Sequence, residues 1–287
     1  MISGTTKLLC LIGSPVEHSM SPLMHNLSCQ ILGLDYAYMA FDIKEHQVQE
    51  FLDTAKLLNI RGFNVTMPCK QEVARLVDEL SPAAEIMQAT NVVVNDNGRF
   101  VGHNTDGIGF VKNLAVHDVD VKDKIFTLMG GGGAGTAVLV QLALDGAKEI
   151  RVFNRKGPNY DKLFGIIERI KAHAPECNVK LCDLSDEREL YSSVKTSDVL
   201  INATSIGMAP NVDQSMINDA TVYHENLVVA EIVYNPIETK MMKDALSAGV
   251  SKVVGGKGML LWQGEEAFRL FTGEQMPVEE VRKRFFD

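Results

Sequence analysis

Short apolar runs alternate with amphipathic stretches along the first third of the chain. The runs at 8–12, 36–43 and 61–66 predict strands, and apolar residues at helical spacing between and after them predict helices. Strands that alternate with helices are typical of parallel βαβ units. A hairpin with an Asn97-Gly98 turn is predicted next, because that dipeptide lies between two further apolar runs. We therefore expect a mixed α/β sheet in this part of the chain.

The second part repeats this alternation around a glycine run. An apolar run at 126–129 predicts a strand, and a second at 136–144 predicts a helix. The residues between them give the pattern G-x-G-x-x-G, in which the glycines allow a tight turn, close approach of a pyrophosphate and close packing of helix on strand. The amides at the helix N-terminus favour an anion. We expect a dinucleotide to bind at this loop, which consists of Gly130, Gly131, Gly132, Gly133, Ala134 and Gly135.

Further strands are predicted at 150–153, 179–181, 199–201, 227–230 and 251–254, with a helix at 160–172. Together with the glycine loop they predict a Rossmann-type doubly wound parallel sheet. Two amphipathic helices are predicted at 259–271 and 278–286. Their periodicity leaves open whether they cover this sheet or return to the first one.

Composition narrows the class of protein. A length of 287 residues is typical of two domains, and a net charge of −9 disfavours a nucleic-acid or acidic-membrane surface. No apolar run approaches the ~20 residues of a membrane span, and the first residues lack the pattern of a signal peptide. The five cysteines include no C-x-x-C pair, so neither a disulfide framework nor a metal site is expected. We expect a cytoplasmic protein.

Cofactor selectivity depends on the residues that follow the strand at 150–153. NAD-preferring folds usually carry an acidic residue at this place to bind the ribose, whereas this chain has Asn154, Arg155 and Lys156. Asn154 can bond a ribose hydroxyl, and the two cations can neutralise a 2′-phosphate. The alternative is that Arg155 and Lys156 are an ordinary surface pair with no role in binding. Asp161 is a nearby acidic residue in the sequence, which weakens the argument from position. The expected cofactor is NAD or NADP.

Two charged residues at helix starts form a candidate proton-transfer unit. Thr66 ends a predicted strand, Lys70 lies in the first turn of the next helix, and Asp106 begins another helix. The positive end of a helix dipole favours neutral lysine, a proton acceptor, and ionised aspartate. Since ligands bind at the carboxyl ends of strands in open α/β sheets, a Lys70–Asp106 pair fits proton transfer. A surface lysine is the alternative.

Ser19 and Ser21 are expected in extended chain, with their hydroxyls pointing the same way. Ser21 suits a helix N-cap with Pro22 at the first helical position. This place favours an anion such as a carboxylate, although capping alone would also explain Ser21.

The chain resembles the shikimate dehydrogenase family, in particular its quinate/shikimate dehydrogenase branch. The resemblance spans nearly the whole chain in the family's order. It rests on Gly13-Ser-Pro-Val-Glu-His-Ser-Met-Ser-Pro22, Asn64-Val-Thr-Met-Pro-Cys-Lys70, Ala89-Thr-Asn91, Gly102-His-Asn-Thr-Asp-Gly107, the glycine loop, Asn202-Ala-Thr-Ser-Ile-Gly-Met208, Val233-Tyr-Asn-Pro236 and Gly256-Lys-Gly-Met-Leu-Leu-Trp-Gln263.

The resemblance implies a role for each matching residue. Lys70 is the proton acceptor of a catalytic pair with Asp106. The substrate-binding residues that it implies are Ser19 and Ser21 for the carboxylate, Thr66, Asn91 and Gln263 for ring hydroxyls, and Tyr234 alongside. The cofactor-binding residues that it implies are the glycine loop, Asn154, Arg155, Lys156, Thr204, Ile232, Gly256 and Met259.

The resemblance also implies that the last helices return to the first domain. The expected domains are 1–116 with 258–287 for substrate binding and catalysis, and 117–257 for the dinucleotide. The branch often carries an acidic residue shortly after the Asn-Arg pair, where this chain has Gly157-Pro158-Asn159. NAD and NADP therefore both stay open.

These observations predict reversible hydride transfer between shikimate, or also quinate, and NAD(P), giving 3-dehydroshikimate or 3-dehydroquinate. The expected partner is a small carboxylated polyol, and the expected assembly is a monomer or homodimer. One alternative is a non-catalytic dinucleotide-sensing regulatory module. Another is a two-domain dehydrogenase of folate-type substrates, which Ser19 and Ser21 would not suit.

Overall fold

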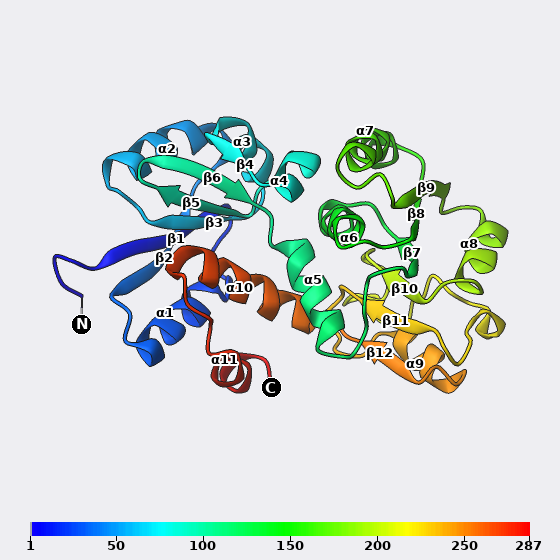
Figure 1. Cartoon of the computed structure of the whole chain (residues 1–287). Helices are drawn as coiled ribbons and strands as arrows, with labels where there is room; N and C mark the ends of the chain where they lie inside the picture. The colour runs from blue at the N-terminus through cyan, green and yellow to red at the C-terminus, as the bar shows by residue number, and fades with distance from the viewer. Residues whose placement is uncertain (1) are drawn as a thin grey trace. The chain divides into compact units, whose positions relative to one another are not determined.

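The chain forms two compact units in the computed structural model, which describes residues 2–287. The first unit comprises Met1–Thr105 and Leu261–Asp287, and the second comprises Asp106–Leu260. Helix α11 (Val278–Phe285) packs against α1 (Ser21–Leu32), so the end of the chain returns to the first unit, as the resemblance implied (Figure 1). The functional domain limits given above stay a prediction.

The first unit is built around a six-stranded mixed sheet of order β2-β1-β3-β5-β6-β4. β1 pairs in parallel with β2 and β3, whereas β5 pairs antiparallel with β3 and β6. The elements of this unit that have not yet been given are β1 (Lys7–Gly13), β2 (Tyr36–Asp42), the short helix η1 (Glu45–Gln47), α2 (Val48–Leu57), β3 (Gly62–Val65), α3 (Lys70–Leu76), β4 (Glu79–Leu80), α4 (Pro82–Met87), β5 (Val92–Asp96), β6 (Arg99–His103) and α10 (Lys257–Thr272), whose residues from 261 belong here.

Helices cover both faces of this sheet because the strands are apolar on both sides. On one face Phe51, Leu52 and Ala55 of α2 pack with Phe63 and other strand residues. On the other face, residues of α10 such as Phe271 pack against Leu9 and Leu11 of β1. The hairpin of β5 and β6 turns at Asn97 and Gly98, both with positive φ, which confirms the predicted Asn-Gly turn.

The second unit contains an all-parallel sheet of order β12-β11-β10-β7-β8-β9. Taking β7 as the first strand of this unit, the order is 3-2-1-4-5-6, which confirms the predicted Rossmann-type topology. Its elements are α5 (Asp106–Ala115), β7 (Ile125–Met129), α6 (Gly133–Leu144), β8 (Glu149–Asn154), α7 (Pro158–His173), β9 (Asn178–Asp183), α8 (Glu187–Val194), β10 (Val199–Asn202), the short helix η2 (Ala220–Val222), β11 (Val228–Glu231), α9 (Lys240–Ser247) and β12 (Lys252–Val254).

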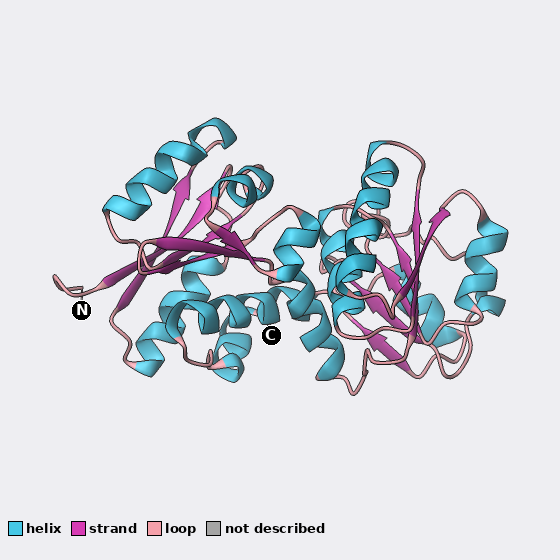
Figure 2. Cartoon of the chain, turned by 45° about the horizontal axis from the view of Figure 1, so that its top comes forward, coloured by secondary structure: helices cyan, strands magenta, loops and turns pink. Residues whose placement is uncertain are grey.

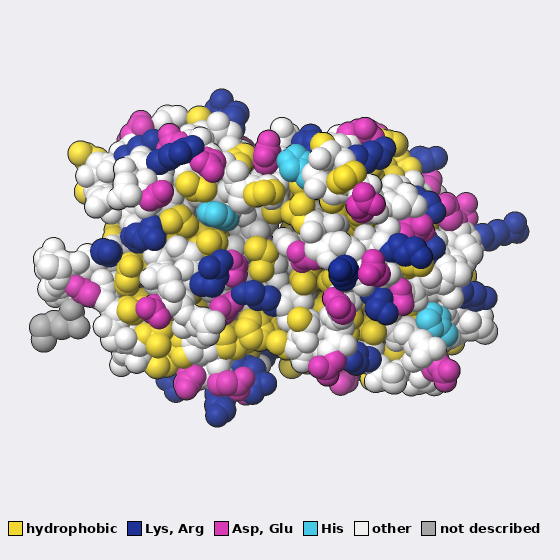
Figure 3. Space-filling view, viewed as in Figure 1, with side chains coloured by type: hydrophobic (Ala, Val, Ile, Leu, Met, Phe, Trp, Pro, Cys, Tyr) yellow, Lys and Arg dark blue, Asp and Glu magenta, His cyan; other side chains and the backbone are white. Residues whose placement is uncertain are grey.

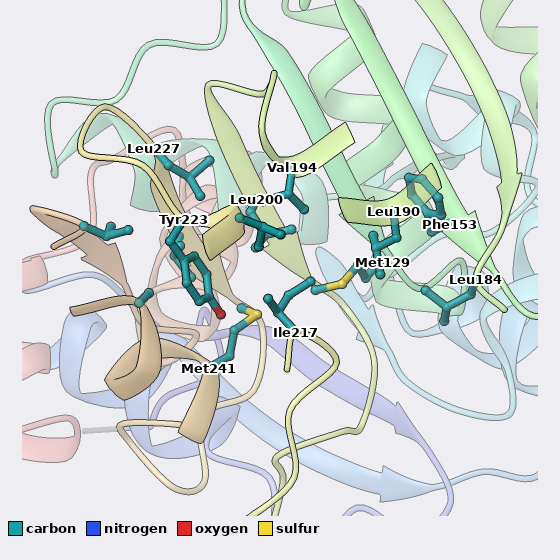
Figure 4. Packing of buried hydrophobic residues seen from close by; sticks show 14 of the residues in the cluster. Met129, Phe153, Leu184, Leu190, Val194, Leu200, Ile217, Tyr223, Leu227 and Met241 are labelled. Atoms are coloured by element: carbon teal, nitrogen blue, oxygen red, sulfur yellow. The ribbon is translucent and has the colours of Figure 1, made fainter. Parts of the chain in front are cut away.

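Helices lie on both faces of this second sheet as well (Figure 2). Figure 4 shows one of its cores, where Leu190 and Val194 of α8 and Met241 of α9 pack with strand residues such as Leu200. α8 and α9 had no counterpart in the sequence prediction. Both have only eight residues, so each offers about two turns in which an apolar period could be recognised.

Charged side chains of both signs are interspersed on the face of each unit that Figure 3 shows. Among residues 2–287, no helix has the length and apolar character needed to cross a membrane. Over the same range, no three His, Cys, Asp or Glu side chains gather in a way that could hold a metal ion.

Gly107 lets α5 approach α6 closely, next to Asp106. A Cβ atom at Gly107 would overlap the carbonyl oxygen of Ala137, which as backbone cannot easily move. We expect Gly107→Ala to lower the free energy of unfolding by about 1–3 kcal/mol, measured by denaturant unfolding. Gly165→Ala is the control, because its Cβ would meet nothing closer than 3.6 Å on a helix. Equal stability of the two variants would contradict this close packing.

Candidate active site

Three predicted site residues share one edge of the first sheet. Thr66 follows the last residue of β3, and Asn91 precedes the antiparallel strand β5. The backbone N–H of Val65 donates to the carbonyl of Asn91 at 2.8 Å, so the two chain segments are neighbours. Lys70 is the first residue of α3, and its carbonyl accepts from the N–H of Thr90 at 3.1 Å. The sheet therefore gathers Thr66, Lys70 and Asn91 where β3 ends.

Thr105 ties this edge to two more distant segments. The side-chain oxygen of Asn91 accepts from the N–H of Thr105 at 2.8 Å, and its amide nitrogen donates to Thr105 Oγ1 at 3.0 Å. Thr105 Oγ1 in turn donates to the carbonyl of Gln263 at 3.1 Å. Both Asn91 and Thr105 are buried. Since Asp106 follows Thr105, the start of α5 is anchored at the same point as Asn91 and the backbone of Gln263.

Lys70 belongs to the first unit and Asp106 to the second. Asp106 is the first residue of α5, as the sequence predicted, and Lys70 the first residue of α3. Their meeting as a catalytic pair stays a prediction.

The region of Ser19 and Ser21 differs from the expectation in two respects. Ser21 is the first residue of α1, and Met20 takes the N-cap position without a side-chain cap. Met20 has helical dihedrals (φ −80°, ψ −14°), so the segment is not extended as expected. The hydroxyl oxygen of Ser19 accepts from the N–H of Ser21 at 3.2 Å. The turn before the helix thus satisfies the Ser21 amide through Ser19, and Ser21 is the first helical residue rather than the N-cap.

Two buried residues that the sequence did not reveal connect Ser21 to Asn91. The Tyr38 hydroxyl donates to the side-chain oxygen of Asn64 at 2.7 Å, and the Asn64 amide donates to the carbonyl of Asn91 at 3.3 Å. Burial raises the pKa of Tyr38 well above its usual value, whereas a hydrogen bond from Ser21 acts in the opposite direction. Tyr38 lies in a strand that reads only as apolar, so no sequence signal pointed to it.

In the second unit, the predicted cofactor residues follow the carboxyl ends of parallel strands. The glycine loop follows β7, Arg155 and Lys156 follow β8, and Thr204 follows β10. Ile232 and the half-exposed Tyr234 follow β11, and Gly256 follows β12. A Cβ at Gly256 would lie 2.5 Å from the carbonyl oxygens of Ile232 and Val233, so these two loops are in contact, and Met259 is buried one turn beyond. This edge is where open α/β sheets bind ligands.

The glycine loop fits a dinucleotide. A Cβ at Gly130 would lie 2.6 Å from the carbonyl oxygen of Ala203, and a Cβ at Gly135 would overlap the carbonyl oxygen of Gly130. Gly132 and Gly133 face open space, with nothing within 4 Å of a Cβ. The first and third glycines of the motif are thus required by the loop's own packing. The open positions leave room for a pyrophosphate at the amides that begin α6.

The residues after β8 form contacts of their own. The side-chain oxygen of Asn154 accepts from the N–H of Gly131 at 3.0 Å, so Asn154 braces the glycine loop. Lys156 Nζ lies 3.3 Å from the carboxylate of Asp183, the last residue of β9, which pairs with Asn154 in register. Hydrogen bonds from Ser185 and the neighbouring Lys156 lower the pKa of Asp183. The sequence singled out Asp161 as the nearby acid, but Asp183 is the one that contacts Lys156.

A hollow of about 310 Å³ lies at the other edge of the first sheet. Lys7 begins β1 and Arg61 precedes β3, so the hollow is at the amino ends of these strands, away from Thr66 and Lys70. It is lined by Lys7, Asn59, Arg61, Asn95, Asp96 and Asn97. It is not part of the candidate site.

Comparison with known families gives two matches. The family described as Shikimate dehydrogenase substrate binding domain matches residues 11–93. The family described as Shikimate 5'-dehydrogenase C-terminal domain matches residues 256–284.

Individual proteins match over nearly the whole chain. Shikimate dehydrogenase (NADP(+)) of Streptococcus uberis is 46% identical, over 100% of this chain and 97% of that protein. The crystal structure of shikimate 5-dehydrogenase from Listeria monocytogenes in complex with shikimate and NAD is 38% identical. It superposes with a TM-score of 0.96 over 99% of this chain and 98% of that one. Quinate dehydrogenase from Corynebacterium glutamicum in complex with NAD is 30% identical, with a TM-score of 0.85 over 98% of each chain.

Proposed function

This chain belongs to the shikimate dehydrogenase family, and from that premise we propose that Lys70 and Asp106 transfer the proton in its reaction. The reaction is the NAD(P)-dependent conversion of shikimate to 3-dehydroshikimate. The observation that carries the assignment is the shared sheet edge of Thr66, Lys70 and Asn91, which Thr105 ties to the start of α5. This edge supplies hydroxyl, amide and ammonium groups, which suit a polyol with one reacting alcohol.

Lys70 accepts the proton of the ring hydroxyl as the carbon that bears it is oxidised. Lys70 is the first residue of α3 and follows the end of β3, where ligands bind in open α/β sheets. Asp106 is the first residue of α5. In the proposed pair, the carboxylate of Asp106 stabilises the ammonium group that Lys70 forms, until the proton passes to solvent.

Further residues hold the substrate. Thr66 and the amides of Asn91 and Gln263 bond ring hydroxyls, and Ser19 and Ser21 bind the carboxylate. Tyr234, which follows β11, lies alongside the ring. Support comes from the hydrogen bonds that run from Ser21 through Tyr38 and Asn64 to Asn91. They fix the residues for the carboxylate and the residues for the ring hydroxyls relative to one sheet. Quinate, which also carries a carboxylate and hydroxyls on a six-membered ring, is the second substrate that we propose.

The open glycines of the loop and the amides that begin α6 would hold the pyrophosphate of the dinucleotide. When bound, NAD(P) accepts or returns the hydride of the reacting carbon. Gly132 and Gly133 leave space for the dinucleotide, and Asn154 holds the glycine loop through Gly131. The adjoining loops contribute Thr204, Ile232, Gly256 and Met259.

Arg155 and Lys156 favour NADP over NAD. We expect the double substitution R155A/K156A to raise the KM for NADP by about tenfold while changing the KM for NAD little, because only NADP carries a 2′-phosphate for these cations. A spectrophotometric assay of shikimate and quinate, each with NAD and NADP, measures both preferences at once. Lys171→Ala, which removes an exposed lysine paired with Glu168 on α7, is the control. Equal changes with both dinucleotides would contradict the assignment.

We propose a cytoplasmic enzyme that is a monomer or a homodimer. Cell fractionation tests the location, and light scattering of the purified protein distinguishes the two assemblies. A membrane-bound fraction or a larger assembly would contradict this part of the proposal.

A further inference from the structure

Glu231 is a fully buried carboxyl group that the reaction described above does not use. It ends β11 and pairs in register with Asn202, which ends β10. Three donors converge on it: the Asn202 amide nitrogen at 3.0 and 3.2 Å, the Thr239 hydroxyl at 2.7 Å, and the backbone N–H of Val233. None of its contacts is an ion pair with a described residue. A charge buried in this way is costly, so its retention calls for a reason.

Asn202 also forms hydrogen bonds with the loop that follows β10. Its side-chain oxygen accepts from both the N–H and the hydroxyl of Thr204, at 3.1 and 2.7 Å. Its amide nitrogen also donates to the carbonyl of Ile206 at 3.1 Å. Because the carboxylate of Glu231 only accepts and the Thr204 N–H only donates, the Asn202 amide fits in one orientation alone. Glu231 favours the same orientation as the Thr204 N–H and the Ile206 carbonyl, and it anchors the Asn202 amide that holds the loop 203–207.

The same loop is in contact with the glycine loop. A Cβ at Gly130 would lie 2.6 Å from the carbonyl oxygen of Ala203, and one at Gly135 would lie 3.1 Å from the Ala203 side chain. The N–H of Ala203 donates to the carbonyl of Met129, the residue before the glycine loop, at 2.7 Å. β7 and β10 are adjacent, and they are the strands at which the order of this sheet reverses. Dinucleotides bind at such a reversal.

We propose that Glu231 is a positioning residue for dinucleotide binding, which acts through Asn202 to hold the loop 203–207 beside the glycine loop. The inference rests on the proposed function, since it takes Thr204 as part of the dinucleotide site. Burial raises the pKa of the Glu231 carboxyl to about 7, while its three donors lower it. Burial outweighs the donors, so the carboxylate, which is the form that cannot donate back to Asn202, predominates only above about pH 7.

The test is Glu231→Gln, which keeps the side chain's shape but removes the charge and one acceptor. The amide of Gln offers one acceptor oxygen where Glu231 offers two, and its NH2 group cannot accept from Asn202, so the anchor of the Asn202 amide is weakened. We expect the Kd for NADPH, measured by its fluorescence at about pH 8.5, to rise about tenfold, with the KM for shikimate changed less than about twofold. A raised Kd for NADPH with a nearly unchanged KM for shikimate separates a role in dinucleotide binding from a general loss of structure.

Ser197→Ala is the matched control. Ser197 is buried just before β10, and its hydroxyl lies 2.8 Å from that of Thr127, so the variant loses a buried hydrogen bond at the opposite end of the same strand. We expect it to lower stability and leave the Kd for NADPH unchanged. A rise in that Kd equal to the one in Glu231→Gln would overturn the proposal.

An unchanged Kd for NADPH in Glu231→Gln would also overturn it. If Glu231→Gln does not fold, Glu231→Asp carries the test, because the shorter side chain keeps the charge but draws the carboxylate away from Asn202. We expect a smaller rise in the Kd for this variant, and an unchanged Kd again overturns the proposal. A wild-type protein that binds NADPH but does not oxidise shikimate would contradict the proposed function instead, because the Kd comparison does not depend on turnover.

Discussion

Lys70→Ala is expected to lower the turnover of shikimate by about 10²–10⁴-fold, the range typical of a lost general base. The substitution removes the amine at the start of α3 and leaves the backbone bond from the Thr90 N–H to the Lys70 carbonyl in place. The fold of this edge should therefore persist. The measurement is the steady-state rate with saturating shikimate and dinucleotide.

The Kd for NADPH separates this effect from a loss of structure. It should stay nearly unchanged in Lys70→Ala, because the dinucleotide residues follow the strands of the other sheet. Lys56→Ala is the matched control, since Lys56 lies on α2, where it pairs with Asp78 and lies over the ring of Phe100, and it is not part of the candidate site. Near-full turnover in Lys70→Ala would show that Lys70 is not the proton acceptor.

Gly135→Ala should abolish dinucleotide binding, with a rise in the Kd for NADPH of about 100-fold or more. The added methyl group would overlap the carbonyl oxygen of Gly130 and press against Ala203. Because the first of these contacts is backbone, the loop between β7 and α6 must change shape. The variant should also unfold at lower denaturant concentration than the wild type.

Gly132→Ala gives a contrast within the same loop. Nothing lies within 4 Å of a Cβ at Gly132, and its φ of −71° is open to any residue. The variant should therefore be as stable as the wild type and yet bind NADPH at least about tenfold more weakly, because the methyl group takes the space of the pyrophosphate. Gly165→Ala on α7 controls for glycine replacement in general. An unchanged Kd for NADPH in Gly132→Ala would show that the pyrophosphate does not bind at Gly132.

Local sequence rules predicted the parts of the fold that depend on local chemistry. The glycine loop needs glycine because of backbone contacts with Gly130 and Ala203, and the hairpin turn needs the positive φ that Asn97 and Gly98 supply. The pattern also placed Lys70 in the first turn of α3 and Asp106 at the start of α5, although α3 begins at Lys70 and not, as predicted, at Pro68. The helix start at Ser21 was wrong by one residue, because Ser19 rather than Ser21 satisfies the free amide.

Features that depend on distant contacts could not be predicted in this way. Tyr38 and Asn64 meet only because β2 and β3 lie on either side of β1, and neither residue is unusual in its own strand. The contact of Lys156 with Asp183 depends likewise on the pairing of β8 with β9. Glu231 occurs within an apolar run, and its hydrogen bonds to Asn202 and Thr239 arise only when β10 and β11 are paired.

The return of the chain's end to the first unit sets an order for folding during synthesis. The second unit is continuous, from Asp106 to Leu260, and all of its strands have been made before the last 27 residues are added. The first unit is not continuous: Phe271 packs on Leu9 and Leu11, and Phe268 and Val281 share a core with Met24. On the ribosome, the part of the protein that is made first thus cannot complete its core until residues 261–287 have been made, whereas the second unit has all its strands before then.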